Sequence, residues 1–142
     1  MKVVIFHGWG ADSRSNWFSW LKQELENKNI SVLCPDLPHT EKPKHDEWLT
    51  KALEFDYDEN TILVGHSLGT ILILRVLEKI QTKIKAVFLV SSFDDCIGFP
   101  ELQTFFQTPF DYASIKNNCS KITMLSSDAD PFIPVPVAER LS

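Results

Sequence analysis

The sequence has few cysteines and no run of basic residues. Its 142 residues include three cysteines, an odd number at wide spacing: Cys34, Cys96 and Cys119. That count fits reduced thiols better than a disulfide framework or a zinc site, so we expect no metal. The net charge is −5, and nowhere do three Lys or Arg residues follow one another. This excludes the usual electrostatic footprint for nucleic acid or an anionic membrane surface, and we expect neither as a partner.

The amino end also lacks a secretory signal. Met1 is followed almost at once by the strand-like run 3–6, without a basic segment, a longer apolar segment or a small-residue cleavage site. The sequence therefore predicts a cytoplasmic protein. It contains no repeat, low-complexity tract or linker, and 44% hydrophobic with 23% charged residues is a globular composition. We expect a single domain over residues 1–142.

What the sequence does contain is a regular alternation of strand and helix patterns. Short β-branched and aromatic runs predict strands at residues 3–6, 30–34, 61–64, 84–90 and 121–125. Apolar residues at helical spacing predict helices at residues 16–28, 46–55 and 68–80, with short helices in an irregular segment at 93–118. Such alternation indicates an α/β fold, a three-layer doubly wound parallel sheet. With right-handed crossovers, we expect the strand order 2-1-3-4-5.

The strongest chemical signal follows the strand predicted at 61–64. Gly65-His66-Ser67-Leu68-Gly69 is a G-x-S-x-G pattern between that strand and a long helix. In this context the pattern predicts a nucleophile elbow, a strained turn that exposes a serine at the carboxyl edge of the sheet. Glycines fit such a turn, where bulkier neighbours would clash. We therefore expect Ser67 to be a nucleophile and Gly65 and Gly69 to be elbow glycines. The alternative is an ordinary tight turn.

Acyl transfer also requires hydrogen-bond donors for the developing oxyanion, because a serine hydroxyl alone is a weak nucleophile. We expect one donor to be the backbone N–H of Leu68, at the start of the helix. The second should come from the loop after the first strand, His7-Gly8-Trp9-Gly10, and we assign it to the N–H of Trp9. The alternative is that the glycines of this loop merely turn the chain.

In α/β-hydrolases the catalytic residues follow the chain order Ser, Asp or Glu, then His. Asp128 and Asp130 come after the last predicted strand, and we assign the acid to Asp130 with Asp128 as the alternative. No histidine follows them in the sequence. The four histidines present are expected to have other roles: His66 points away from the adjacent serine, His7 shapes the oxyanion loop, His39 follows a distant strand, and His45 is solvated. We therefore expect this chain to lack its catalytic base and to be strongly impaired in turnover.

The order and spacing of these motifs resemble the YdeN-like serine hydrolases, the group that includes retinoblastoma-binding protein nine. The resemblance rests on residues 7–10, residues 16–21, the elbow at Ser67, Ser91-Ser92-Phe93 and residues 130–134. It implies a small, nearly lidless α/β-hydrolase with a Ser-Asp-His triad, in which Ser67 is the nucleophile and Asp130 the acid. It also implies activity on small carboxylic esters or amides, with peptidase activity in some members. We expect no cofactor.

The sequence departs from that family in two respects. Members continue through a further helix and strand to a Gly-His loop that carries the base, and then a final helix, so we expect a C-terminally incomplete domain. We also expect the strand at 121–125 to be an uncovered sheet edge through which the chain self-associates. The second departure is the absence of the family's Leu-x-Cys-x-Glu motif. The retinoblastoma protein is therefore not implied as a partner.

The aromatic residues leave one question open. We expect Trp17, Trp20 and Trp48 to pack helices on the sheet rather than to form a substrate platform. Four phenylalanines lie where hydrolases build a cap, and they fit an acyl pocket and simple packing about equally: Phe99, Phe105, Phe106 and Phe110. The function predicted is hydrolysis of a small ester through a Ser67 acyl-enzyme. The alternatives are a non-catalytic binding module that keeps the pocket, or an acyltransferase or peptidase with the same nucleophile.

Overall fold

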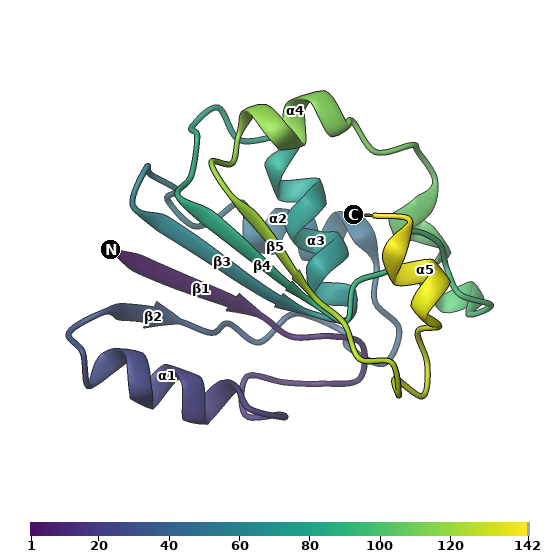
Figure 1. Cartoon of the computed structure of the whole chain (residues 1–142), viewed down its shortest axis with the longest axis horizontal. Coiled ribbons are helices and arrows are strands. Elements are labelled where there is room, and N and C mark those ends of the chain that lie inside the picture. The colour runs from purple at the N-terminus through teal and green to yellow at the C-terminus, as the bar shows by residue number, and fades with distance from the viewer. Residues whose placement is uncertain (142) are drawn as a thin grey trace.

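The computed structural model of the protein describes residues 1–141 and contains a five-stranded, fully parallel sheet in the order β2-β1-β3-β4-β5 (Figure 1). The strands are β1 (Lys2–Phe6), β2 (Ser31–Leu33), β3 (Thr61–His66), β4 (Ala86–Val90) and β5 (Ile122–Leu125). The helices are α1 (Phe18–Glu26), α2 (His45–Ala52), α3 (Leu68–Leu77), the 3-10 helix η1 (Pro100–Phe106), α4 (Tyr112–Asn117) and α5 (Val135–Glu139). The predicted α/β class and strand order are confirmed.

Strand β1 is buried on both faces, because helices lie on both sides of the sheet. Successive side chains of a strand point to opposite faces. In β1, Val4 and Phe6 are buried in the core that contains α2 and α3. Val3 and Ile5 pack instead with α1. Figure 1 shows α1 beside β2 on one side of the sheet and α3 and α4 on the other. Burial on both faces explains the continuous apolar run that predicted this strand.

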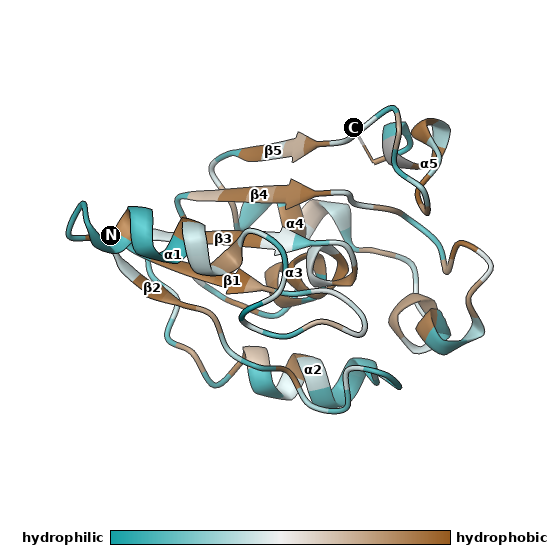
Figure 2. Cartoon of the chain, turned by 90° about the horizontal axis from the view of Figure 1, so that it is seen from below, coloured by the Kyte–Doolittle hydropathy of each residue, from teal (hydrophilic) through white to brown (hydrophobic). Residues whose placement is uncertain are grey.

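Helix α3 lies in the interior of the molecule. All of its residues, Leu68–Leu77, are buried, including the polar Thr70 and Arg75. Figure 2 shows this helix and the strands as largely apolar, whereas α1 and α2 carry hydrophilic stretches. A helix that begins directly after the elbow is therefore held firmly by its surroundings. No helix within residues 1–141 is long and apolar enough to cross a membrane.

Some element boundaries differ from the prediction. The helices end at Glu26, Ala52 and Leu77, two or three residues before the expected ends. Strand β3 continues to His66, because this residue still pairs with Val90 of β4. Helix α5 was not predicted at all. It is short and has a proline at its second position, which the first turn of a helix tolerates but which reads in the sequence as a break.

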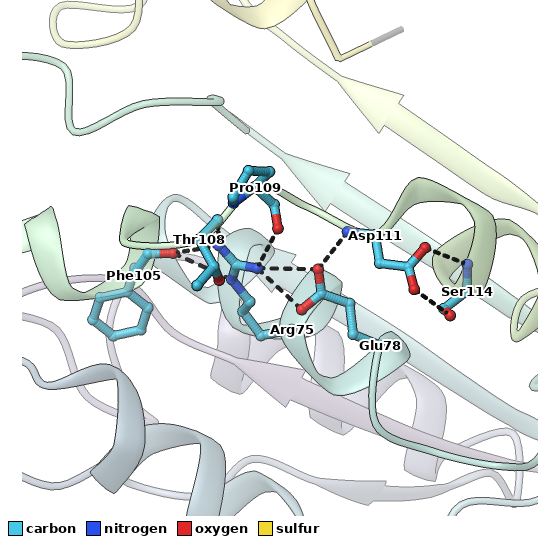
Figure 3. Close-up of polar contacts among 7 residues, drawn as sticks. All are labelled: Arg75, Glu78, Phe105, Thr108, Pro109, Asp111 and Ser114. Atoms are coloured by element: carbon cyan, nitrogen blue, oxygen red, sulfur yellow. Dashed lines mark hydrogen bonds and ion pairs between the residues drawn. The ribbon is translucent and has the colours of Figure 1, made fainter.

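Arg75 ties the connection between η1 and α4 to α3 (Figure 3). The side chain of Arg75 is only 4% exposed, and its Nη1 donates to both carboxylate oxygens of Glu78 at 3.0 Å. Its Nη2 donates to the carbonyl oxygens of Phe105 at 2.9 Å and Thr108 at 2.6 Å. Glu78 in turn accepts a hydrogen bond from the N–H of Asp111 at 2.8 Å. A buried ion pair therefore fixes a segment that has little regular structure of its own.

We expect Arg75→Met to lower the free energy of unfolding by about 3–5 kcal/mol, because breaking a buried ion pair leaves the other charge without a partner. Glu78, whose side chain is 10% exposed, would lose its cation. Urea unfolding followed by circular dichroism measures the change. The control is Arg140→Met, since Arg140 pairs with Asp94 and Asp95 at the surface. That variant should unfold near the parent midpoint. Similar losses in both variants would contradict the assigned role of Arg75.

Candidate active site

Ser67 occupies a sharp turn between β3 and α3, at the carboxyl edge of the sheet. Its backbone has φ 52° and ψ −123°, a strained conformation for a residue other than glycine. The N–H of Ser67 donates to the carbonyl of Val90 at 2.9 Å, and its carbonyl accepts from the N–H of Thr70 at 2.9 Å. The turn is thus anchored to the neighbouring strand and to the first turn of α3. This is the strand-turn-helix context in which the G-x-S-x-G pattern forms an elbow.

The glycines around the turn allow three backbone segments to approach one another. A Cβ atom on Gly69 would lie 2.2 Å from the carbonyl oxygen of Phe6, and one on Gly65 would lie 2.8 Å from the carbonyl carbon of Gly69. On Gly8 it would lie 3.0 Å from the Cβ of Ser67. Backbone atoms cannot move aside as a flexible side chain would. A side chain at position 69 would therefore push α3 away from β1, and one at position 65 would push α3 away from β3.

His7 fixes the loop that follows β1. The side chain is fully buried, its Nε2 accepts from the N–H of Leu37 at 2.9 Å, and its Nδ1 donates to the carbonyl of Gly8 at 2.9 Å. Burial lowers the pKa of His7, which keeps the ring neutral, as this pair of bonds requires. A further bond joins the N–H of Gly10 to the carbonyl of Thr40 at 2.9 Å. Loop 7–10 is thus held against the loop after β2.

The two residues assigned as oxyanion donors lie at the cavity: Trp9 lines it together with Ser67, and Leu68 follows Ser67 directly. Trp9 is held through its side chain, whose indole N–H donates to the carbonyl of Glu41 at 3.1 Å and whose ring packs edge-on against Phe99 at 5.2 Å. The backbone N–H groups of Trp9 and Leu68 have no hydrogen-bond partner within residues 1–141. Unpaired donors next to a nucleophile are what an oxyanion site requires. The assignment of these two donors nevertheless stays a prediction.

Asp130 lies in the loop after β5 and lines the same cavity as Ser67. Its Oδ1 accepts hydrogen bonds from the N–H groups of Phe132 at 2.9 Å and Ile133 at 3.0 Å. Burial alone would raise the pKa of Asp130. The two backbone bonds, with smaller contributions from the hydroxyl of Ser91 and from nearby His66, outweigh burial and hold that pKa below its usual value. The carboxylate is therefore stabilised in its charged form.

Asp128, the alternative acid, has different surroundings. Its side chain is exposed, and it does not line the cavity that contains Ser67 and Asp130. The structure therefore brings Asp130, and not Asp128, to the same cavity as the serine. The assignment of the acid to Asp130 stays a prediction.

The cavity has a volume of about 560 Å³ and largely apolar walls. Its apolar lining includes Trp9, Phe93, Ile97, Phe99, Leu102 and Ile133. Of the four phenylalanines left open by the sequence, only Phe99 lines it. Phe105 is buried against Trp48 at 5.5 Å, Phe106 packs on Phe93 and Phe110 lies under the guanidinium of Arg75. The remaining three are therefore packing residues.

The tryptophan predictions are correct in two of three cases. Trp48 is fully buried, and Trp17 packs in the core between α1 and the sheet. Trp20, however, is 64% exposed, so its predicted packing on the sheet is wrong. The inward stripe of α1 continues from Trp17 through residues spaced by four, Leu21 and Leu25. Trp20 lies off that stripe and faces solvent.

No histidine ring hydrogen-bonds to Ser67 or Asp130 in the described part of the chain. The ring of His66 packs edge-on against Trp17 at 6.0 Å and Phe18 at 5.9 Å, and its Nδ1 is buried without a partner within residues 1–141. Burial lowers the pKa of His66, although the charge of Asp130 acts in the opposite direction. His66 therefore precedes Ser67 directly, and its ring packs among aromatic neighbours.

The other two histidines lie outside the cavity. His39 is exposed and bonds to Glu47 at 2.7 Å. His45 was expected to be solvated, which is wrong: its side chain is 23% exposed and packs edge-on against Phe105 at 5.8 Å. The reason is that His45 begins α2 rather than preceding it, so its ring turns toward η1.

Sequence reasoning used Ser91 only within the resemblance and gave it no role, although this residue lines the cavity together with Ser67 and Asp130. The available signal was its position directly after the strand predicted at 84–90, since side chains at the carboxyl ends of parallel strands meet at one edge. Within residues 1–141, no three His, Cys, Asp or Glu side chains are gathered as a metal ion would require, and the three cysteines are unpaired.

Comparison with known proteins gives matches along nearly the whole chain. The serine hydrolase family model matches residues 3–142. YdeN of Bacillus subtilis is 32% identical over 148 residues, which cover 99% of this chain and 77% of YdeN. The serine hydrolase RBBP9 of Rattus norvegicus is 31% identical over 147 residues, covering 98% of this chain and 78% of RBBP9.

Solved structures agree with the sequence matches. The crystal structure of the ydeN gene product from B. subtilis matches with a TM-score of 0.91 at 32% identity, over 99% of this chain and 78% of that one. Est1E from Butyrivibrio proteoclasticus matches with a TM-score of 0.73 at 15% identity, over 99% of this chain and 72% of the Est1E chain. At this identity the match shows a shared fold only. The elbow, the α/β sheet and these matches lead to one conclusion: the chain belongs to the serine hydrolase family.

Proposed function

We propose that this member of the family hydrolyses small carboxylic esters and amides through an acyl-enzyme on Ser67. The observation that carries the proposal is the position of Ser67 in a strained turn that opens onto an apolar cavity. Two further features support it. The backbone N–H groups of Trp9 and Leu68 have no partner within residues 1–141, and Asp130, whose charged form is stabilised, lines the same cavity as Ser67.

In the proposed mechanism, the Oγ of Ser67 attacks the substrate carbonyl carbon while an imidazole base takes its proton. The backbone N–H groups of Trp9 and Leu68 hold the negative oxygen of the tetrahedral intermediate. The intermediate collapses, the protonated imidazole gives its proton to the leaving alcohol or amine, and water then hydrolyses the acyl-Ser67 ester by the same route. Asp130 holds the imidazole in the required tautomer.

The base in this proposal is an imidazole other than the four in this sequence. His7 has both ring nitrogens bonded to the backbone, and His66 packs among aromatic rings. His39 and His45 do not line the cavity. A polypeptide of these 142 residues should therefore retain only the contribution of binding and the oxyanion site, about 10³ to 10⁴ over water in triad hydrolases.

Added imidazole tests this proposal directly. We expect the 142-residue polypeptide to hydrolyse p-nitrophenyl acetate slowly, and the rate to rise with imidazole beyond the reaction of imidazole alone. The matched control is Ser67→Ala, in which the excess over free imidazole should vanish. Full turnover without imidazole would show that one of the four histidines is the base. No excess in the parent would contradict the proposed hydrolase.

A binding module is the second candidate, because no histidine within residues 1–141 hydrogen-bonds to Ser67 or Asp130. The apolar cavity would then hold an uncharged ester or acid without reaction. Isothermal titration with an ester, combined with intact mass spectrometry, separates the two candidates. Binding without a covalent adduct, even in the presence of imidazole, would favour the module. Acyl transfer to an added alcohol in preference to water would instead indicate an acyltransferase.

We further propose that a polypeptide of these 142 residues self-associates. Strand β5 is a sheet edge, and Ile122 and Leu125 are 37% and 51% exposed. An apolar groove adjoins it between α1 and the strands, lined by residues that include Leu21, Ile62, Phe88 and Leu125. Exposed edges and apolar patches pair with other chains.

Light scattering after gel filtration measures this association, which we expect at micromolar concentration. Leu125→Lys should reduce it, because a charge on an edge strand opposes pairing. The control is Leu53→Lys, which changes an exposed leucine outside β5 and the groove. A parent that stays monomeric over the whole concentration range would refute the proposed self-association.

A further inference from the structure

The cavity of the candidate active site has two sides, which lie above opposite faces of the sheet. Helix α1 covers one face and α3 the other (Figure 1). Successive side chains of a strand point to opposite faces. In β3, Leu63 packs in the core on the α3 face and Val64 in the core on the α1 face. His66 also points to the α1 face, since its ring contacts that of Trp17 at 6.0 Å.

The side of the cavity above the α3 face is apolar. Trp9 and Phe99 pack against the core on that face and form an edge-on pair with ring centroids 5.2 Å apart. The indole N–H of Trp9 is already bonded to the carbonyl of Glu41. Three further lining residues are buried in the same core: Phe93, Leu102 and Ile133. These side chains suit an apolar part of a substrate.

The side above the α1 face includes Asn16. This residue lines the cavity and directly precedes Trp17, whose ring contacts His66. Asn16 is exposed, and its side-chain amide has no hydrogen-bond partner within residues 1–141. An amide has two donor hydrogens and an acceptor oxygen. A polar group of a bound substrate can therefore donate to it or accept from it.

The turn that contains Asn16 is held in place by hydrogen bonds. The N–H of Ser13 donates to the Oδ1 of Asp36, in the loop after β2, at 2.7 Å. The N–H of Phe18 donates to the carbonyl of Ser15 at 3.3 Å, which closes a four-residue turn with Asn16 as its second residue. The amide is therefore carried by a backbone that is fixed both to the neighbouring loop and to the start of α1.

The backbone at position 16 favours glycine over asparagine. Asn16 has φ +53°, and the next residue, Trp17, has φ −96° and ψ 5°. These values fit a type II′ turn, in which the second residue is usually glycine. Asparagine is therefore strained here, and strain of this kind is concentrated at active sites and ligand clamps.

We propose that Asn16 is a specificity-determining residue, and that the cavity binds esters with an apolar group on one side of the carbonyl and hydroxyl or amide groups on the other. The apolar group lies against Trp9 and Phe99, and the polar group bonds to the amide of Asn16. The inference rests on the proposed function, in which Ser67 attacks the carbonyl between the two groups.

The test compares two butyrate esters that differ only in hydroxyl groups, 1-butyrylglycerol and propyl butyrate. Their binding to the 142-residue polypeptide is followed by ligand-observed NMR, with Ser67→Ala as the background so that no turnover is required. In that background we expect Asn16→Gly to weaken binding of the glycerol ester about 3- to 10-fold, the effect of one lost hydrogen bond. Binding of the propyl ester should not change. Glycine adopts the positive φ without strain, so the turn should persist.

The matched control is Asn29→Gly, the same substitution at another exposed asparagine with a positive φ, 61°, outside the cavity. It should leave the binding of both esters unchanged. Phe99→Ala should weaken the binding of both esters alike, since it removes part of the apolar side that both contact.

Unchanged binding of the glycerol ester in Asn16→Gly would overturn the inference and leave Asn16 as a turn residue only. An equal loss for both esters in that variant would overturn it as well, because it would indicate a changed cavity shape rather than a lost hydrogen bond. Failure of Ser67 to form an acyl-enzyme would overturn the proposed function without altering these binding measurements.

Discussion

Ser67→Ala is expected to lower turnover by about six orders of magnitude in a form of the protein that carries a catalytic histidine, as loss of the nucleophile does in other triad hydrolases. The fold should remain intact, because the backbone of the turn is held by bonds to Val90 and Thr70 rather than by the serine Oγ. Alanine at position 67 must adopt the same positive φ as serine does, so the backbone strain is unchanged. Hydrolysis of p-nitrophenyl acetate measures the loss, and thermal unfolding checks the fold.

The matched control for this variant is Ser126→Ala, which removes a hydroxyl from an exposed serine just beyond β5. It does not line the cavity. We expect its turnover to equal that of the parent. If Ser67→Ala also turned over the ester at the parent rate, the nucleophile would have to be another residue.

Asp130→Asn should lower kcat by about 10⁴ in the same histidine-containing form, because the amide no longer selects the imidazole tautomer that accepts the serine proton. The change is nearly isosteric and leaves an oxygen that can still accept from Phe132 and Ile133. Asp128→Asn is the natural comparison, since it makes the same change two residues away on an exposed side chain. We expect little effect there. The reverse ranking of the two variants would transfer the role of the acid to Asp128.

The fold could be predicted largely because its signals are local. The apolar run at 3–6 specifies a buried strand. The elbow glycines specify a close contact between strand and helix, because a Cβ atom on Gly69 would lie 2.2 Å from the carbonyl oxygen of Phe6. The segment around η1 was predicted to hold short helices, but without their bounds or their position. Its position depends on Arg75 bonding to the carbonyls of Phe105 and Thr108, and carbonyl groups are present at every residue. Nothing in the sequence shows which of these carbonyl groups will accept a hydrogen bond from Arg75.

The elbow at Ser67 could be predicted because its motif requires a particular backbone conformation. The positions of single aromatic side chains could be predicted less well, because they depend on packing between distant segments. Phe99 lines the cavity whereas Phe105 is buried in the core, and the sequence alone left both residues with the same two alternatives. The packing of Trp20 was predicted wrongly because α1 turns only the face with Trp17, Leu21 and Leu25 toward the sheet. Ser91 was given no role because neither its positive φ nor its place in the cavity lining can be read from the sequence.

The most direct measurement of the central claim is covalent labelling with a fluorophosphonate, with imidazole added to the 142-residue polypeptide, followed by intact mass and peptide mapping. The account predicts one adduct, located on the peptide that contains Ser67 and absent in Ser67→Ala. It also predicts faster labelling as imidazole is increased. An adduct on another residue, or none at any imidazole concentration, would contradict the assignment of Ser67 as the nucleophile of a serine hydrolase.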